Sequence, residues 1–474
     1  MKKYIIALSA LVMASSCATD EAYDSANQNP NKPTQVTSDA LFTSATKTLF
    51  DQNESTSVNS NIFRLLSQYW TETTYIDEAN YDLVTRNIPQ NYWSNIYRNV
   101  LFDLKDAKTR ANNANKKAMI EVVEVYTWQQ MVDTFGDIPY SAALQGSADP
   151  TPVYDDAADI YADLLVRLNS ALANFNPNPA SVSEQGFTTS DVIYHGDINH
   201  WLKFANSLKL KIAMRLSDVN ASVSKTAAEQ AVAAGVFTSN SDNATIQYEA
   251  NPTNANPLWV DLVQSNRTDF VVANTVVDYM NAKNDPRREF YFDDNLVGGY
   301  EGGTYGASNN YNSKTHIGDL MHQQTFRGVL LDYSEVQFLL AEAAARTYNT
   351  GSSVTTHYNN AITASMQDWG VSSSDITTYL LRPDVAYATA AGDWRQKIGF
   401  QFWLAMYNRG HEGWSVYRKF DTPAMNVPPI SEEAVPTRLT YPLNEQTLNK
   451  TNYTAAASAI GGDLKGTKLF WDVN

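Results

Sequence analysis

The sequence predicts a mostly α-helical protein in which tetratricopeptide-like helix pairs form a superhelical layer, with an irregular, loop-rich region packed on it. Three observations support this fold class. Apolar residues recur every three or four positions in several segments, which is the spacing of a buried helix face. Short polar turns join some of these segments into antiparallel pairs. In contrast, residues 236–330 are rich in Asn, Gly, Asp and Tyr, which favour turns and loops.

Helical stripes are clearest in three segments of the first half of the chain. In the third of them, Lys203, Lys209 and Lys211 fall outside the apolar face. A further segment, 119–132, is apolar nearly all round, so we expect it to pack on more than one side. The three stripes consist of Ile96, Val100, Leu104, Ala107 and Ala111; of Ile160, Leu164, Leu168, Leu172 and Phe175; and of Trp201, Phe204, Leu208, Ile212 and Leu216.

Two antiparallel helix pairs follow from the spacing of these segments. One pair joins 95–112 to 118–134, and the other joins 333–346 to 357–369. In the second pair, alanines allow the helices to approach closely, and the spacing of Tyr and Ala-Ile suggests a tetratricopeptide-like unit. No fixed period of about 34 residues runs through the chain, so we do not expect a regular repeat array.

The N-terminus has the pattern of a signal peptide followed by an attachment site. Lys2 and Lys3 are basic, an apolar stretch follows, and small residues precede Cys17, the only cysteine of the chain. This pattern resembles a bacterial lipobox, in which the signal is cut before the cysteine and its thiol is acylated. Ala14 stands where Leu is usual, and an ordinary secretory signal with a chance cysteine is the alternative. No other stretch approaches the length of a membrane span.

These patterns predict one domain behind a lipid anchor. We expect a signal peptide at 1–16 and a lipidated Cys17 with a polar tether over 17–38. A single domain over 39–474 follows. Its helical layer is expected mainly in 39–235 and 330–420, and its loop-rich ligand region mainly in 236–330.

Composition and charge limit the classes of partner. Of the 474 residues, 43% are hydrophobic and 18% are charged, which is typical of a globular protein rather than a disordered one. The net charge of -16 argues against nucleic acid as a partner, because its phosphates would be repelled. It does not argue against a neutral ligand such as a sugar. A single cysteine leaves no intramolecular disulfide and no zinc site built from cysteines.

Known catalytic motifs are missing from the sequence. It contains no nucleophile elbow, no phosphate-binding loop, no dinucleotide fingerprint and no metalloprotease helix, and we predict no cofactor. His411 and Glu412 are adjacent, but a packed or capping histidine is the simpler interpretation. Carboxylates are plentiful, so a surface glycoside hydrolase stays open. Residues 239–244 and 292–295 offer oxygens to calcium but lack the spacing of a calcium loop, so structural calcium has no motif to support it.

A surplus of aromatic residues in loops is the main functional signal. Aromatics make up 12% of the chain, including 27 Tyr and 10 Trp. An aromatic ring can stack on the C–H face of a sugar, while Asn and Arg bind its hydroxyl groups. The alternative is that such rings turn inward and anchor the loops. The candidate ligand-binding residues are Trp70, Tyr75, Asn80, Tyr81, Trp259, Arg267, Tyr300, Tyr305 and Tyr311.

The segment 201–217, WLKFANSLKLKIAMRLS, resembles the signature helix of the SusD-like (SusD/RagB) outer-membrane lipoproteins of Bacteroidetes. The chain is most similar to the subgroup with the KFANSLKL helix. Other segments agree in order along nearly the whole mature chain, and their combination is specific although each alone is weak. They are DTFGDIPYSAAL at 133–144, IYADLLVRLNSAL at 160–172, NDPRREFYF at 284–292, YSEVQFLLAEAAAR at 333–346, RGHEGWSVYRKF at 409–420 and RLTYPLNEQTLN at 438–449.

The resemblance implies a binding protein without catalytic activity. It implies four tetratricopeptide-like helix pairs with a loop-rich region packed on them, and a SusC-like, TonB-dependent barrel in the outer membrane as partner. The ligand is then a nutrient, usually an oligosaccharide and sometimes a peptide, captured at the cell exterior by loops in 67–92 and 255–315. Asp20 and Glu21 follow Cys17 where relatives carry acidic residues that direct lipoproteins to the cell surface.

Overall fold

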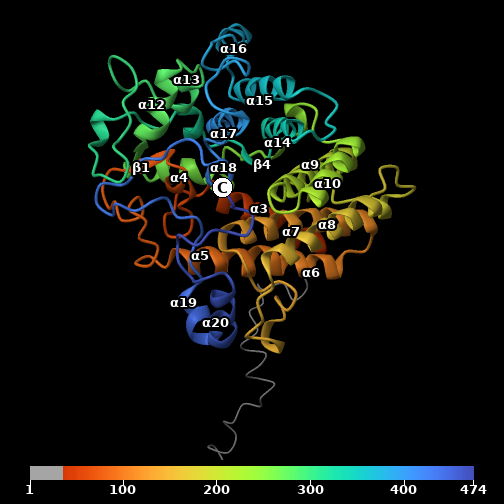
Figure 1. The fold of residues 1–474 in the computed structure, drawn as a ribbon. Coiled ribbons are helices and arrows are strands. Elements are labelled where there is room, and N and C mark those ends of the chain that lie inside the picture. The colour runs from red at the N-terminus through yellow and green to blue at the C-terminus, as the bar shows by residue number, and fades with distance from the viewer. Residues whose placement is uncertain (1–35) are drawn as a thin grey trace, which may run out of the picture.

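The computed structural model describes residues 36–474 (Figure 1). The predicted signal peptide, Cys17 and nearly all of the tether lie outside the described residues and stay predictions. Within 36–474, none of the helices combines the length and the hydropathy needed to span a bilayer.

Helices of the N-terminal half form a layer in which sequence neighbours pack side by side, α7 on α8 and α9 on α10 (Figure 1). Side chains that accept hydrogen bonds from free backbone N–H groups fix several of their starts, for example Asn113 at α7 and Asp197 at α9. The layer comprises α3 (Ser38–Glu54), α5 (Ile88–Asn95), the π-helix η1 (Ile96–Leu101), α6 (Phe102–Arg110), α7 (Ala114–Phe135), α8 (Ala157–Asn174), α9 (Ile198–Arg215) and α10 (Ala221–Ala234).

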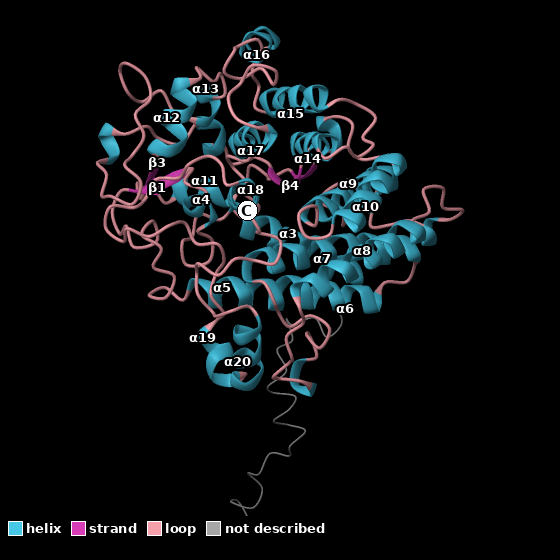
Figure 2. Cartoon of the chain, viewed as in Figure 1, coloured by secondary structure: helices cyan, strands magenta, loops and turns pink. Residues whose placement is uncertain are grey.

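A second group of helices continues the layer after the loop-rich region. Its first pair, α14 with α15, packs side by side, and α14 also contacts α9. The group comprises α14 (Tyr333–Ala345), α15 (Val354–Asp368), α16 (Ser373–Leu380), α17 (Trp394–Ala405) and α18 (Gly410–Phe420). The chain then reaches α19 (Leu443–Leu448) and α20 (Lys450–Ala459). The mostly helical fold predicted from the sequence is confirmed (Figure 2).

The loop-rich region is held by two short antiparallel sheets (Figure 2). In one sheet β1 (Trp70–Glu72) pairs with β3 (Phe270–Val272), so segments some 200 residues apart in sequence lie side by side. In the other, β2 (Ala244–Ile246) pairs with β4 (Gly328–Leu331). The remaining elements within residues 36–474 are α4 (Phe63–Leu66), α11 (Pro257–Trp259), the π-helix η5 (Val260–Gln264), α12 (Asn274–Ala282), α13 (Arg288–Tyr291) and five 3-10 turns.

Helix α9 is buried more completely than its apolar stripe predicts. Lys211 lies outside the stripe, yet it is buried, with Nζ 2.8 Å from Glu335 and 2.5 Å from Glu412. Arg215 also reaches Glu412, at 3.3 Å. Burial alone would raise the pKa of Glu412, but the neighbouring cations outweigh it and hold that pKa well below its ordinary value. An ion network therefore joins α9, α14 and α18 through the core.

Candidate functional site

The two segments predicted to carry the ligand surface, 67–92 and 255–315, are hydrogen-bonded to each other. Asn80 Nδ2 donates to the carbonyl of Gly306 at 2.8 Å, and its Oδ1 accepts from the backbone N–H of Ser431 at 3.1 Å. Asn309 Nδ2 donates to the carbonyl of Glu72 at 2.9 Å. The side-chain amide of Asn80 therefore links three loops through its hydrogen bonds.

Three of the predicted ligand aromatics are core residues, which corrects the expectation that their rings face a ligand. Trp70, Tyr81 and Tyr305 are only 2%, 1% and 1% exposed. Trp70 Nε1 donates to the hydroxyl of Tyr407 at 3.2 Å, and Tyr305 Oη donates to the carbonyl of Leu65 at 2.8 Å. Burial raises the pKa of Tyr81 to about 12. All three residues of β1 are buried, and because successive side chains of a strand point to opposite faces, both faces of the strand are covered.

Tyr75, Trp259 and Arg267 keep accessible side chains. Tyr75 is 74% exposed and has a left-handed backbone with φ of 56°, which turns its ring away from the fold. Trp259 is half-buried at the end of α11. Arg267 is exposed, with its guanidinium 3.7 Å from Asp269, a surface distance that leaves it free to bind other groups.

Tyr300 and Tyr311 are half-buried, and each is held by a neighbour. Tyr300 packs edge-on against Phe292, with ring centroids 5.4 Å apart. Tyr311 stacks on His316 at 3.8 Å, and His316 Nε2 is hydrogen-bonded to the backbone carbonyl of Tyr311 at 3.0 Å. Each ring keeps part of its surface in solvent. We call these two tyrosines, together with Tyr75, Trp259 and Arg267, the loop face, meaning the accessible residues among the predicted ligand contacts.

A buried pair of carboxyl groups supports the loop that carries Tyr75. Glu72 Oε2 accepts from the backbone N–H of Ala79 at 2.9 Å, and Glu78 forms an ion pair with Arg86. Burial, together with the nearby Glu78, raises the pKa of Glu72 to about 9. At neutral pH Glu72 is therefore protonated.

Residues near the C-terminal end of the chain extend the loop face, and sequence reasoning missed them. Val427 and Ile430 are exposed. Gly306, with φ of +72°, lies so close to Pro428 that a Cβ would come within 2.6 Å of it. No periodicity in the sequence indicates the position of residues 427–430. They lie here because this segment makes a long-range contact with the loop of Asn80.

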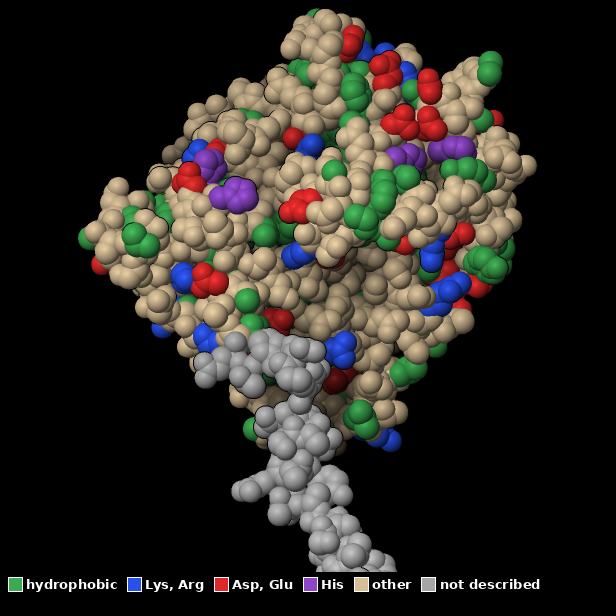
Figure 3. Space-filling model, turned by 180° about the vertical axis from the view of Figure 1, so that it is seen from behind, with side chains coloured by type: hydrophobic (Ala, Val, Ile, Leu, Met, Phe, Trp, Pro, Cys, Tyr) green, Lys and Arg blue, Asp and Glu red, His purple; other side chains and the backbone are tan. Residues whose placement is uncertain are grey.

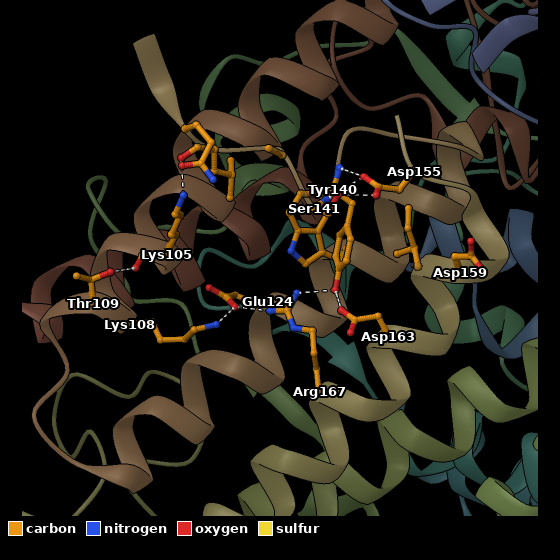
Figure 4. Close-up of a pocket in the computed structure, with 15 residues that line it drawn as sticks. Lys105, Lys108, Thr109, Glu124, Tyr140, Ser141, Asp155, Asp159, Asp163 and Arg167 are labelled. Atoms are coloured by element: carbon orange, nitrogen blue, oxygen red, sulfur yellow. Dashed lines mark hydrogen bonds and ion pairs between the residues drawn. The ribbon is translucent and has the colours of Figure 1, made fainter. Parts of the chain in front are cut away.

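Two cavities lie on the helical layer, on either side of the loop between α7 and α8. One, of about 650 Å³, lies between α6 and α8, and most of the residues that line it are polar or charged, so we call it the polar groove (Figure 4). The other, of about 360 Å³, is lined by Trp93, Tyr97 and Phe102 among others. The signal for the second cavity was available in the sequence as three aromatics four and five residues apart. Tyr97 and Phe102 lie in the predicted helix 95–112 but outside its apolar stripe, and Trp93 precedes that helix.

Within residues 36–474, no group of three or more His, Cys, Asp or Glu side chains is arranged to hold a metal ion. In the segment 239–244, Asp242 instead accepts from the backbone N–H of Thr238 at 2.7 Å and pairs with Lys203 at 2.8 Å. On the face drawn in Figure 3, Lys and Arg side chains are interspersed with Asp and Glu, unlike the continuous basic surface of nucleic-acid-binding proteins.

Residues 30–442 match the SusD-like family model described as "Starch-binding associating with outer membrane". The chain belongs to this SusD-like family. A chitin-binding SusD homologue from Flavobacterium johnsoniae is 26% identical with a TM-score of 0.79, covering 92% of this chain and 97% of that one. A SusD homologue from Bacteroides ovatus is 26% identical with a TM-score of 0.76, covering 92% and 99%. A comparison with curated proteins finds no significant match.

The family settles the class of activity. SusD-like proteins are binding proteins rather than enzymes, as the family description and the chitin-binding homologue indicate. The prediction that this SusD-like protein is not an enzyme is therefore confirmed. The abundant carboxylates, which left a glycoside hydrolase open, act in ion pairs and caps in many places, for example at Asp197 and Glu412.

Proposed function

We propose that this SusD-like protein is a cell-surface lipoprotein that captures an oligosaccharide and delivers it to a SusC-like, TonB-dependent transporter in the outer membrane. The family match over residues 30–442, in a family described as starch-binding and associated with the outer membrane, carries the proposal. A chitin-binding homologue of the same fold supports a glycan ligand. The lipobox-like Cys17 supports the anchor, with a signal peptide at 1–16, a tether over 17–38 and one ligand-binding domain over 39–474.

The loop face is the proposed contact with the oligosaccharide. Tyr75 offers a nearly free ring, and Tyr300, Tyr311 and Trp259 offer partly exposed ones. Arg267 supplies N–H donors for hydroxyl groups. A shallow platform of this kind desolvates little surface, so we expect modest affinity, which suits a protein that must release its cargo.

Delivery requires a rigid body that docks and a ligand surface that moves with it. The ion network of α9, α14 and α18 ties the helical layer together, which favours movement as one unit. We propose that this layer docks on the barrel and that the protein opens over it like a lid, passing the oligosaccharide inward.

Isothermal titration against a panel of plant, fungal and host glycans tests the ligand. Binding of at least one glycan, weakened by Tyr75→Ala or Trp259→Ala, is the expected outcome. A peptide is the alternative cargo, and binding of peptides but no glycan would replace the saccharide half of the proposal.

Purification from detergent-solubilised membranes tests the partner, because a TonB-dependent barrel should come with the protein.

A further inference from the structure

An aromatic cleft opens on the helical layer, away from the residues of the loop face. It has a volume of about 360 Å³, and Trp93, Tyr97, Phe102, Pro139 and Pro152 form much of its wall. The rings of Trp93 and Tyr97 stack at 4.8 Å with 30° between their planes. Phe102 is 46% exposed, an uncommon position for a phenylalanine.

A distortion of the backbone brings these aromatics onto one side of the helix. Residues Ile96–Leu101 form a π-helix, in which the N–H of Phe102 donates to the carbonyl of Tyr97, five residues earlier. In a regular α-helix two residues five apart would point about 140° away from each other. The wider π-turn reduces this angle, and both Tyr97 and Phe102 line the cleft. Such single π-turns are rare and are often found at functional sites.

The loop that covers the cleft is held under strain. Leu144 has φ of +63°, which is unfavourable for a bulky side chain. Its carbonyl accepts from Lys105 Nζ at 2.7 Å, and the carbonyl of Pro139 in the same loop accepts from Tyr97 Oη at 2.5 Å. Helices η1 and α6 thus hold the loop at both ends.

Ala143 and Leu144 also form a wall of the polar groove, of about 650 Å³, on the other side of this loop. Figure 4 shows Lys105 and Lys108 on one side of the groove, Asp159 and Asp163 on the other, and Tyr140 between them. The Tyr140 ring packs edge-on against Trp128 at 4.9 Å.

Most charges in the groove are already compensated. Lys108 pairs with both Glu121 and Glu124, and Arg167 pairs with the same two carboxylates. The carboxylate of Asp159, in contrast, has no hydrogen-bond or ion-pair partner among residues 36–474. The groove therefore offers polar groups for hydroxyls next to an aromatic ring, without a large excess of one charge.

We propose that the aromatic cleft and the polar groove, which share a wall formed by Ala143 and Leu144, together form a second glycan site for a short neutral oligosaccharide. The cleft supplies apolar ring faces and the groove supplies hydrogen-bonding groups, and sugars combine C–H faces with hydroxyl groups in this way. The cleft has a volume within the range of small-molecule pockets. The site is separate from the loop face, and only the choice of saccharides as ligand class rests on the proposed function.

Phe102→Ala, Arg98→Ala and Asp159→Asn test the site, because all three residues are exposed and line it. Val166→Ala, an exposed apolar residue of α8 that lines neither cavity, is the matched control. The probes are malto-, cello-, xylo- and N-acetylchito-oligosaccharides of three to six units, titrated against the full mature chain with tryptophan fluorescence as a second readout. We expect Phe102→Ala to weaken one binding event about tenfold, as the loss of a stacking ring implies, and Val166→Ala to change nothing.

Comparison with Tyr75→Ala separates this proposal from the loop face. Two independent events, one lost with Phe102→Ala and one with Tyr75→Ala, support both sites. If the three cleft and groove variants bind every sugar as the control does, the second site is refuted and the loop face stands. If these variants instead lose a co-purifying barrel while sugar binding persists, the cleft is a protein interface and the glycan site is refuted. If tripeptides bind and no sugar does, the second site is refuted while nutrient capture survives.

Discussion

Tyrosines of this protein differ in where their hydroxyl groups can find partners. The hydroxyl of Tyr305 donates a hydrogen bond to a backbone carbonyl inside the core, and the ring is buried with it. Tyr75 itself has a left-handed backbone conformation in a loop, and its ring is exposed to solvent. Both occur in similar polar, aromatic-rich sequence, so their composition does not distinguish an anchor from a ligand contact.

This difference predicts opposite effects for two variants. Tyr305→Phe removes the hydrogen bond to the Leu65 carbonyl and should lower the free energy of unfolding by about 1 kcal/mol. It should leave glycan affinity unchanged. Tyr75→Ala should leave the denaturant midpoint within error and weaken glycan binding. Chemical denaturation and titration on both proteins check the pair, and the reverse pattern would place the ligand at Tyr305 instead.

The raised pKa of Glu72 makes stability depend on pH. In the folded protein the pKa is about 9, against an ordinary value of 4.5, so the folded state keeps a proton that the unfolded state releases. The free energy of unfolding should therefore fall as the pH rises from about 4.5 towards 9. Glu72→Gln keeps the neutral, buried form and should flatten this part of the profile.

Urea denaturation at pH 5, 7 and 8.5 measures the effect. Glu289→Gln, at an exposed glutamate, is the control and should follow the wild-type profile. A Glu72→Gln protein as pH-sensitive as the wild type would show that Glu72 is ionised in the folded state.

At the scale of helices, short-range sequence patterns predict the secondary structure wherever tertiary contacts do not override it. The stripes predicted in 96–111 and 160–175 lie in helices up to their last residues, Ala111 and Phe175, which cap the helix ends, because apolar residues at this spacing share one face of a helix. The burial of Lys211 could not be predicted in this way, since its partners Glu335 and Glu412 come from helices far along the chain. The π-turn at Ile96–Leu101 likewise has no pattern of its own in the sequence.

The candidate site, like the helices, can be predicted from the sequence only in part. The sequence identifies segments 67–92 and 255–315, which the structure joins through β1 and β3. It does not tell which rings point outward, because that depends on strand pairing and on the carbonyls each hydroxyl reaches. The residues around Val427 join the loop face only through contacts with Asn80 and Gly306.

The ion network of α9 should be essential for the helical layer. Lys211→Met leaves Glu335 and Glu412 buried without the cation between them, and removing one member of a buried pair costs about 3–5 kcal/mol. Lys225→Met, at an exposed lysine of α10, should change stability by no more than about 0.5 kcal/mol. Thermal and urea denaturation compare the two, and equal stabilities would mean that the network contributes little.

At the scale of the whole molecule, function depends on where the domain is held. In the proposed function, the lipid on Cys17 holds the domain at the outer membrane, beside its proposed transporter. The tether before α3 would then set how far the domain can swing from the barrel. A lid that opens and closes repeatedly over one barrel requires such a tether, since a released domain would be diluted away.

Cys17→Ser therefore tests the anchor and the proposed lid together. Acyl chains contribute about 0.8 kcal/mol per buried methylene, so two or three chains hold a protein firmly on a membrane. We expect the wild-type protein to incorporate labelled palmitate, to fractionate with the outer membrane and to be removed by protease added to intact cells. The Cys17→Ser protein should lack the label and leave the membrane fraction, while keeping the glycan affinity of the purified domain. If the wild-type protein survives protease on intact cells, it faces the periplasm, and capture from outside the cell is refuted even if the lipid is present.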